Sequence, residues 1–194
     1  MLALRAGEQK AQEISIMRCA ASLLSLVLVF AVSAAEVESR VLTHYVPQDL
    51  LETAVRTEKW SEVPLAVKGG LRKGDVVRIW AGGLIDRGDG ETPGQKVNGP
   101  AGAPADPVPG GNLALAPDAE LAYALLFKSE TSGPKKCLAA GKPLEIKLGK
   151  DGERLWVGFN DERGRYLDNH LGKGRRHEFD PLWVRIEVVR IVID

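Results

Sequence analysis

Residues 160–169, with the sequence NDERGRYLDN, contain the side chains best suited to chemistry in this chain. Asp161 and Asp168 supply carboxylates, two asparagines supply amide oxygens, and Gly164 allows the backbone to turn sharply between them. Residues 154–159, directly before this stretch, form an apolar run that indicates a buried strand. Ca²⁺ in proteins takes about 6–8 oxygen ligands at flexible geometry. The spacing therefore predicts a calcium site on a tight loop at the end of a strand.

The N-terminal part has the features of a secretory signal. Arg18 precedes an apolar run at residues 20–32, and small residues follow at 33–35. The run is shorter than the roughly 20 apolar residues that span a bilayer. We therefore expect residues 1–35 to be cleaved and the protein to be exported, to the periplasm or outside the cell. An uncleaved N-terminal anchor is the alternative, and Met17 is an alternative start because the residues before it are polar.

Charge and cysteine content narrow the class of partner. The chain has 26 basic and 26 acidic side chains, so its formal net charge is zero. This balance argues against nucleic acid or an anionic membrane recognised through bulk charge, and it favours a neutral ligand.

Once residues 1–35 are removed, Cys137 is the one remaining cysteine and cannot form an intramolecular disulfide. We expect a plain thiol, exposed or half-buried, and no nucleophile.

The elements that position the loop are expected to be short strands. We expect residues 36–59 to form a lead segment with a helix near 47–55. Residues 60–194 are expected to form the main domain. Trp80 and Trp156 lie within expected strands and are predicted to be core residues. Many short strands and little helix favour an all-β, antiparallel sandwich. The expected strands, rich in β-forming residues and separated by turn residues, are 63–67, 76–82, 121–128, 144–148, 154–159 and 183–193.

Familiar catalytic motifs are missing from the sequence. There is no P-loop, no Gly-x-Ser-x-Gly elbow and no pair of histidines at the spacing of a zinc site. Asp86, Asp89 and Glu91 could act as acid and base partners of Asp161, but surface loops are commonly acidic. Enzyme activity is therefore not predicted.

Five motifs, in this order along the chain, carry a resemblance to a known family. They are KGDVVRIWAGG at 73–83, GPAG at 99–102, YALLFK at 123–128, FND at 159–161 and YLDN at 166–169. The series resembles the LecA-type (PA-IL-like) calcium-dependent galactose lectins, and more closely the LecA-like domains of exported bacterial proteins. The resemblance covers about residues 60–189. It implies a jelly-roll-like β-sandwich with one Ca²⁺ at its rim, whose shell two sugar hydroxyls complete. It also allows a homo-oligomer, since the lectin type forms multimers.

The resemblance also implies a set of ligand residues. The side chains of Asp161, Asp168 and Asn169 would bind the metal, together with the main-chain carbonyls of Arg165 and Arg87. These would supply five or six oxygens and leave positions that a vicinal diol could fill. Asp161 and Asp168 would therefore also lie at the sugar.

Two departures from the lectin pattern bear on the sugar. The lectin type has an amide where Asp168 stands, so the second carboxylate should strengthen ion binding. An inserted basic stretch, residues 170–177, would lie beside the metal and either cover the site or contact a larger or acidic ligand; a solvated loop is the alternative. In the long loop 88–112, Asp106 falls near a further sugar-contacting position of the family. Tyr166, inside the calcium loop, is expected to pack beneath it and fix its shape.

Three functions follow from the sequence. The first is an exported, calcium-dependent module that binds galactose-like or other diol-bearing glycans. The second is a sandwich that uses Ca²⁺ to brace a loop and binds a protein or cell-surface partner. The third, the least favoured, is a glycoside hydrolase acting through its aspartate-rich loops.

Overall fold

The structure is a computed structural model that describes residues 37–88, 97–103, 112–139, 141–171 and 180–193. The expected signal at 1–35, Asp106, and residues 172–177 of the basic insertion lie outside these ranges. Residues Ser39–Val192 form one compact unit, and the second unit, Met1–Glu38 with Ile193 and Asp194, is almost wholly undescribed. No helix in the described ranges is long and apolar enough to cross a membrane.

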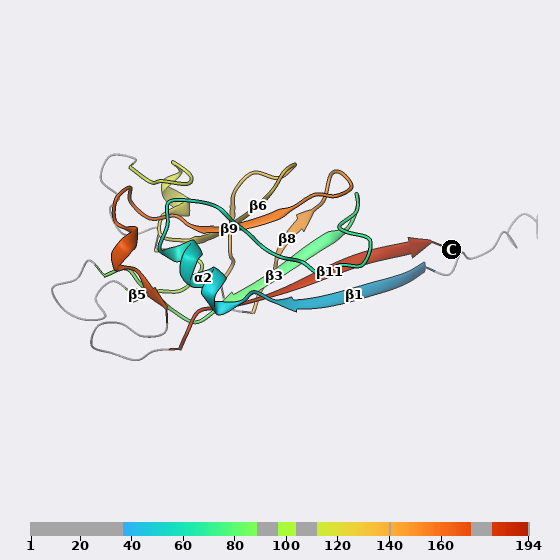
Figure 1. Ribbon diagram of the computed structural model, residues 1–194, viewed down its shortest axis with the longest axis horizontal. Coiled ribbons are helices and arrows are strands. Elements are labelled where there is room, and N and C mark those ends of the chain that lie inside the picture. Colours follow the sequence, from blue (N-terminus) through green and yellow to red (C-terminus); the bar gives the residue numbers. More distant parts are fainter. Residues whose placement is uncertain (1–36, 89–96, 104–111, 140, 172–179, 194) are drawn as a thin grey trace, which may run out of the picture. The chain divides into compact units, whose positions relative to one another are not determined.

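The protein is an all-β antiparallel sandwich, as predicted (Figure 1). One sheet has the order β1 (Val37–Tyr45), β11 (Trp183–Ile193), β3 (Val76–Gly82) and β8 (Leu144–Lys147). A second sheet has the order β2 (Ser61–Glu62), β9 (Leu155–Phe159), β6 (Leu125–Ser129) and β7 (Lys135–Lys136). A small third sheet contains β10 (His170–Leu171), β4 (Ile85–Asp86) and β5 (Val97–Asn98). The jelly-roll arrangement of these strands stays a prediction.

Alternating burial explains how the strands form one core. In β8, Leu144 and Ile146 are buried while Glu145 and Lys147 face solvent, because successive side chains of a strand point to opposite faces. β3 and β11 alternate in much the same way, whereas the central strands β6 and β9 bury residues on both faces. Their inner residues, from both four-stranded sheets, meet in a single apolar cluster that includes Val77, Ile79, Val184, Ile186, Leu125, Phe127, Val157 and Phe159.

The lead segment belongs to the sandwich. Its helix α2 spans Gln48–Val55, close to the predicted range, and buries Leu51, Ala54 and Val55 in the core. Its first half is β1, which lies beside β11, and the Val46 N–H donates to the Val184 carbonyl at 3.1 Å. Residues 39–59 therefore pack in the same compact unit as the predicted main domain.

Several local predictions were wrong. Residues 63–67 are not a strand, and strand pairing with β9 is confined to Ser61–Glu62 of β2. The Val63 N–H still donates to the Leu155 carbonyl at 2.8 Å, but Leu155 is the first residue of β9, so β9 has no residue that could pair with 64–67. The predicted strand at 121–128 begins only at Leu125, because residues Ala119–Leu121 form the 3₁₀ helix η2.

Two side-chain predictions were also wrong. Trp80 and Trp156 are partly exposed on the outer faces of the sheets, where cationic side chains stack on them. The Arg185 guanidinium lies 4.3 Å from the Trp80 ring centroid, and the Arg154 guanidinium lies 5.1 Å from that of Trp156. Cys137 is 1% exposed, and burial raises the pKa of its thiol to about 12. It is therefore a core residue, neither exposed nor half-buried.

Candidate metal centre

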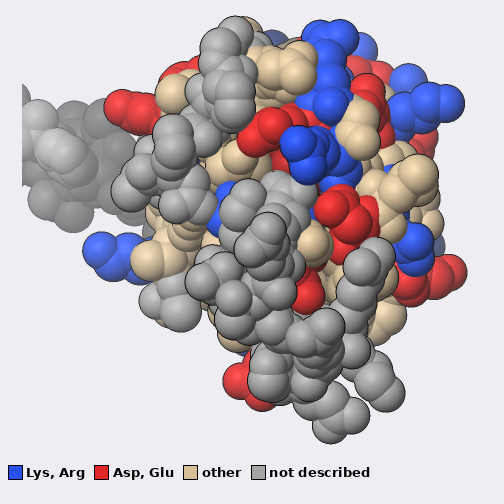
Figure 2. All heavy atoms as spheres, turned by 90° about the vertical axis from the view of Figure 1, so that its left-hand side faces the viewer, with Lys and Arg blue, Asp and Glu red and all other residues tan. Residues whose placement is uncertain are grey.

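The loop 160–169 connects β9 to β10 and lies on the side of the compact unit that faces the viewer in Figure 2. Acidic and basic side chains are interspersed on that side. Within the loop, Tyr166–Asp168 form the 3₁₀ helix η3, and Gly164 has a positive φ of 80°. That backbone conformation favours glycine, so the sharp turn predicted at this position is present.

Asp161 and Asn169 meet in the buried part of the loop. The Asn169 Nδ2 donates to Asp161 Oδ2 at 2.9 Å and to the Val55 carbonyl at 2.7 Å. The side chains are almost fully buried, at 1% and 0% exposure. The two donated bonds fix the orientation of the amide, and they leave Asn169 Oδ1 buried with no hydrogen-bond partner in the described part of the chain. A buried oxygen in this state is unusual and costs free energy unless a further group binds it.

The segment that ends β4 lies against Asp168. β4 pairs with β10, with Asp86 opposite His170, so residues 86–88 and 168–170 are neighbours. Gly88 has a positive φ of 69°, and a Cβ there would lie 2.5 Å from the Asp168 Cβ. The structure thus places the segment that contains Arg87 beside the loop, although the two are about 80 residues apart in the sequence.

Arg87 and Arg165 differ in their surroundings. The Arg87 side chain is 3% exposed, and its guanidinium lies 3.8 Å from the Tyr123 ring centroid. Arg165 is exposed and precedes η3 as its N-cap residue. The predicted role of each residue is that of a main-chain carbonyl ligand, and that role stays a prediction.

Tyr166 packs beneath the loop, as predicted. Its side chain is 3% exposed, its hydroxyl accepts from the Asp161 N–H at 3.0 Å and donates to the Phe159 carbonyl at 2.8 Å. Burial raises the pKa of this phenol above its ordinary value, so the hydroxyl stays protonated. Tyr166 therefore fixes the backbone at the position from which Asp161 projects.

Asn160 is a structural residue, although its amide also belongs to the oxygen-rich stretch. Its Oδ1 accepts from the N–H groups of Leu115 and Ala116, and its Nδ2 donates to the carbonyls of Ala116 and Leu121. With all four of these bonds made, the amide has no oxygen left for a ligand. It holds residues 115–121 against the start of the loop.

Two residues were missed as parts of this site: Tyr123, outside the loop, and Glu162, within it. The Tyr123 hydroxyl donates to Glu162 Oε1 at 2.7 Å, and Tyr123 has a positive φ of 54°, which is uncommon outside glycine. Burial and then the Glu162 carboxylate raise the pKa of Tyr123. Tyr123 lies within the YALLFK motif, so its position could have been singled out. Its contact with Glu162 is set by tertiary packing.

The donor atoms at this loop are oxygens, which is the ligand type that a hard cation such as Ca²⁺ prefers. No three His, Cys, Asp or Glu side chains come together among the described residues, so carboxylates alone could not form a cage there. An ion at this loop would need amide and main-chain oxygens as well, which Ca²⁺ accepts readily. The partnerless Oδ1 of Asn169 is a donor of the required type. Soft-metal chemistry has no support, since the described cysteine, Cys137, is buried in the core.

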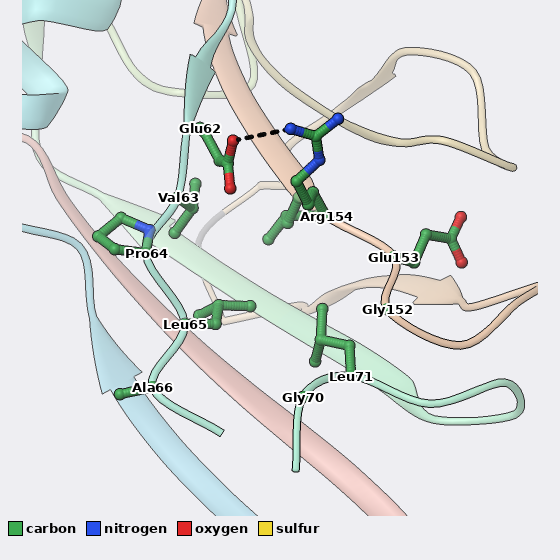
Figure 3. A pocket seen from close by; sticks show the side chains of 11 residues that line it. Glu62, Val63, Pro64, Leu65, Ala66, Gly70, Leu71, Gly152, Glu153 and Arg154 are labelled. Carbon is green, nitrogen blue, oxygen red and sulfur yellow. Dashed lines mark hydrogen bonds and ion pairs between the residues drawn. The ribbon is translucent and has the colours of Figure 1, made fainter. Parts of the chain in front are cut away.

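A pocket of about 370 Å³ lies between residues 62–71 and 152–155, away from the loop residues (Figure 3). Its floor is apolar, and the Glu62–Arg154 ion pair, at 3.4 Å, borders it. The Glu153 carboxylate points away from the pocket in this view. With no group in the pocket suited to catalysis or metal binding, the loop 160–169 remains the candidate site.

No protein-family model matches the sequence, and no curated protein matches it.

Proposed function

We propose that this protein is an exported, calcium-dependent carbohydrate-binding module related to the LecA-type lectins, and not an enzyme. The observation that carries the proposal is the buried pair Asp161 and Asn169, in which the Asn169 Oδ1 has no hydrogen-bond partner among the described residues. The segment with Arg87 lies beside Asp168 of the same loop and would add main-chain oxygens from a second part of the chain. Export is supported by the signal features of residues 1–35.

In this proposal each residue of the loop has a distinct task. Asp161, Asp168 and Asn169 bind Ca²⁺ with side-chain oxygens, and Arg165 and Arg87 do so with carbonyls. The bound ion supplies open coordination positions for two vicinal hydroxyls of a galactose-like sugar. Tyr166 holds the Asp161 backbone, and Asn160 anchors the start of the loop. Asp106 would add a polar contact to the sugar.

A second function is favoured by the bonds between the loop and α2. Asn169 donates to the Val55 carbonyl, and Arg56 Nη2 donates to the Leu167 carbonyl at 3.2 Å. An ion bound to Asn169 would thus stabilise the end of α2 as well as the loop. In this alternative the ion has a structural role, and the sandwich binds a protein or cell-surface partner.

Thermal unfolding of the purified protein in three conditions separates these functions. The conditions are chelator, Ca²⁺, and Ca²⁺ with galactose, with Mg²⁺ as the control ion. A ligand present at about 100 times its Kd stabilises the native state by about 2.7 kcal/mol. We expect a rise in Tm with Ca²⁺ and a further rise with galactose. A rise with Ca²⁺ that no sugar increases supports the structural ion, and identical Tm values in all conditions would refute both functions.

A further inference from the structure

β1 forms an open edge of the first sheet. It pairs with β11, and no described strand lies on its other side. The Val46 N–H donates to Val184 of β11, and the two strands run in opposite directions in Figure 1. In an antiparallel strand the main-chain groups of alternate residues point to opposite sides. The N–H and C=O groups of Ser39, Val41 and Thr43 therefore point away from β11.

Apolar side chains are exposed on both faces of this edge. Val41 is 51% exposed and Leu42 is 40% exposed, and as successive residues they point to opposite faces of the sheet. Tyr45, at 71%, shares the face of Val41. A long edge strand whose outward main-chain groups face no described strand, and which exposes apolar side chains, is a template for pairing with another strand.

The other sheet edges are protected, so β1 is exceptional within the same molecule. The outer strands β2, β7, β5 and β10 have two residues each, and β8 has four. Exposed charges lie on several of them, including Glu145 and Lys147 on β8 and Lys135 on β7. Short length and charge are the usual means of preventing edge pairing. β1, with nine residues, has neither form of protection along Val41–Tyr45.

We propose that β1 pairs antiparallel with β1 of a second copy of this chain, about a twofold axis at Val41. In this register Val41 lies opposite Val41, Ser39 opposite Thr43, and Arg40 opposite Leu42, so no like charges are opposed among these residues. A shift of the axis to Arg40 would oppose two arginines, and a shift to Leu42 would oppose Arg40 and His44. The outward-pointing groups of residues 39, 41 and 43 make about six hydrogen bonds across the axis.

The second copy is the occupant that fits this edge because it supplies an identical strand of equal length. The exposed side chain of Ile191, on the adjacent inner strand β11, adds a further apolar residue next to the edge. Strand pairing alone buries less area than a standard interface of about 1,600 Å². We therefore expect a reversible dimer whose population depends on protein concentration.

A cysteine cross-link tests the register. In a Cys19→Ser background, Val41→Cys is expected to give a covalent dimer on mild oxidation, because the Cα atoms of such a pair lie about 5.5 Å apart. The matched control is Ile191→Cys, which is also exposed but does not lie on the open edge, and which should stay monomeric on a non-reducing gel. Cys137 is buried in both proteins. Equal cross-linking of the two variants, or none in Val41→Cys, would overturn the proposal.

Removal of one outward-pointing N–H tests the pairing itself. Thr43→Pro deletes a donor on the open side and leaves the bonds to β11 intact, a position at which proline is tolerated in edge strands. Sedimentation should show a dimer for the parent protein and for Thr43→Ala, and a monomer for Thr43→Pro. Far-UV circular dichroism checks that the proline variant is folded. If this variant does not fold, the Val41→Cys cross-link alone tests the proposed dimer. A monomeric parent protein, or a folded proline variant that still dimerises, contradicts the inference.

Discussion

At the scale of single residues, the two asparagines of the loop 160–169 have the same chemistry and different tasks. Asn160 uses both ends of its amide on the main chain of residues 115–121. Asn169 uses only its Nδ2, and its buried Oδ1 has no hydrogen-bond partner. Because a buried polar atom is costly when it has no partner, Asn169 Oδ1 marks the point at which a ligand would be most stabilising.

The first prediction concerns the proposed calcium ligands. Asp161→Ala should abolish the Ca²⁺-induced rise in Tm, because it removes both oxygens of a buried side chain that is proposed to bind the ion. Asp168→Asn should weaken the response less, since an amide oxygen remains at the position. Glu62→Gln, a carboxylate outside the loop, is the control and should respond as the parent protein does.

Calorimetric titration with Ca²⁺ measures these differences directly, with circular dichroism to confirm that each variant is folded. The expected order of affinity is parent, then Asp168→Asn, then Asp161→Ala. A parent-like affinity in Asp161→Ala would remove that residue from the site.

At the scale of elements, Glu153 connects two turns at one end of the sandwich. Its Oε1 accepts from Ser129 Oγ at 2.7 Å and the Thr131 N–H at 2.6 Å, and its Oε2 accepts from the Gly149 N–H at 2.8 Å. The carboxylate therefore joins the turn after β6 to the turn after β8. Burial alone would raise the pKa of Glu153, but these hydrogen bonds outweigh it and lower the pKa to about 2.

The second prediction follows from this pKa. The folded-state pKa of Glu153 lies below its ordinary value of 4.5, so the stabilisation is complete above pH 4.5 and is lost as the pH falls toward 2. Glu153→Gln should lower the free energy of unfolding by roughly 2–3 kcal/mol at pH 7. Denaturant unfolding between pH 7 and pH 2 should show a flatter pH dependence for the variant. An unchanged slope would show that Glu153 is not the titrating group.

At the scale of the whole molecule, an ion pair joins two distant parts of the chain: the residue before β3 and the strand β11. Asp75 and Arg190 are 115 residues apart, and the guanidinium donates to both carboxylate oxygens, at 3.0 and 2.7 Å. Arg190 also donates to the Gly70 carbonyl at 2.8 Å. The Asp75 side chain is 3% exposed; burial raises its pKa, but the bonds from Arg190 and the Arg72 N–H together hold the pKa below its ordinary value.

The third prediction is the effect of breaking this pair. Asp75→Asn should cost about 3–5 kcal/mol of unfolding free energy, because it leaves a charged guanidinium in a largely buried place. Glu145→Gln, which breaks the exposed Arg78–Glu145 pair, is the matched control and should cost about 0–1 kcal/mol. Equal losses in the two variants, measured by urea unfolding at pH 7, would contradict this account.

The pH dependence of the pair has a definite sign. Since the folded-state pKa of Asp75 is lowered from 3.8, its stabilisation is present above that pH and decreases as the pH falls below it.

Local patterns in the sequence were sufficient for much of the fold. Strict alternation of apolar and polar residues predicted β8, because such a strand buries only one face. Runs of β-forming residues predicted β3, β9 and β11. The oxygen-rich loop could be recognised from the sequence because its residues are adjacent in the chain. The two-residue strands were not predicted, because such short pairings depend on the neighbouring strand and not on their own residues.

The sequence by itself determined the all-β class and the stretch that carries the candidate ligands. Only the tertiary structure decided that Asn169 bonds to Val55, that Arg87 stacks on Tyr123, and that β1 lies beside β11. It also distinguished Asn160 from Asn169, which have the same side chain. Composition and spacing describe neighbours along the chain, whereas these contacts join residues brought together by burial of the shared core, which local propensity does not encode.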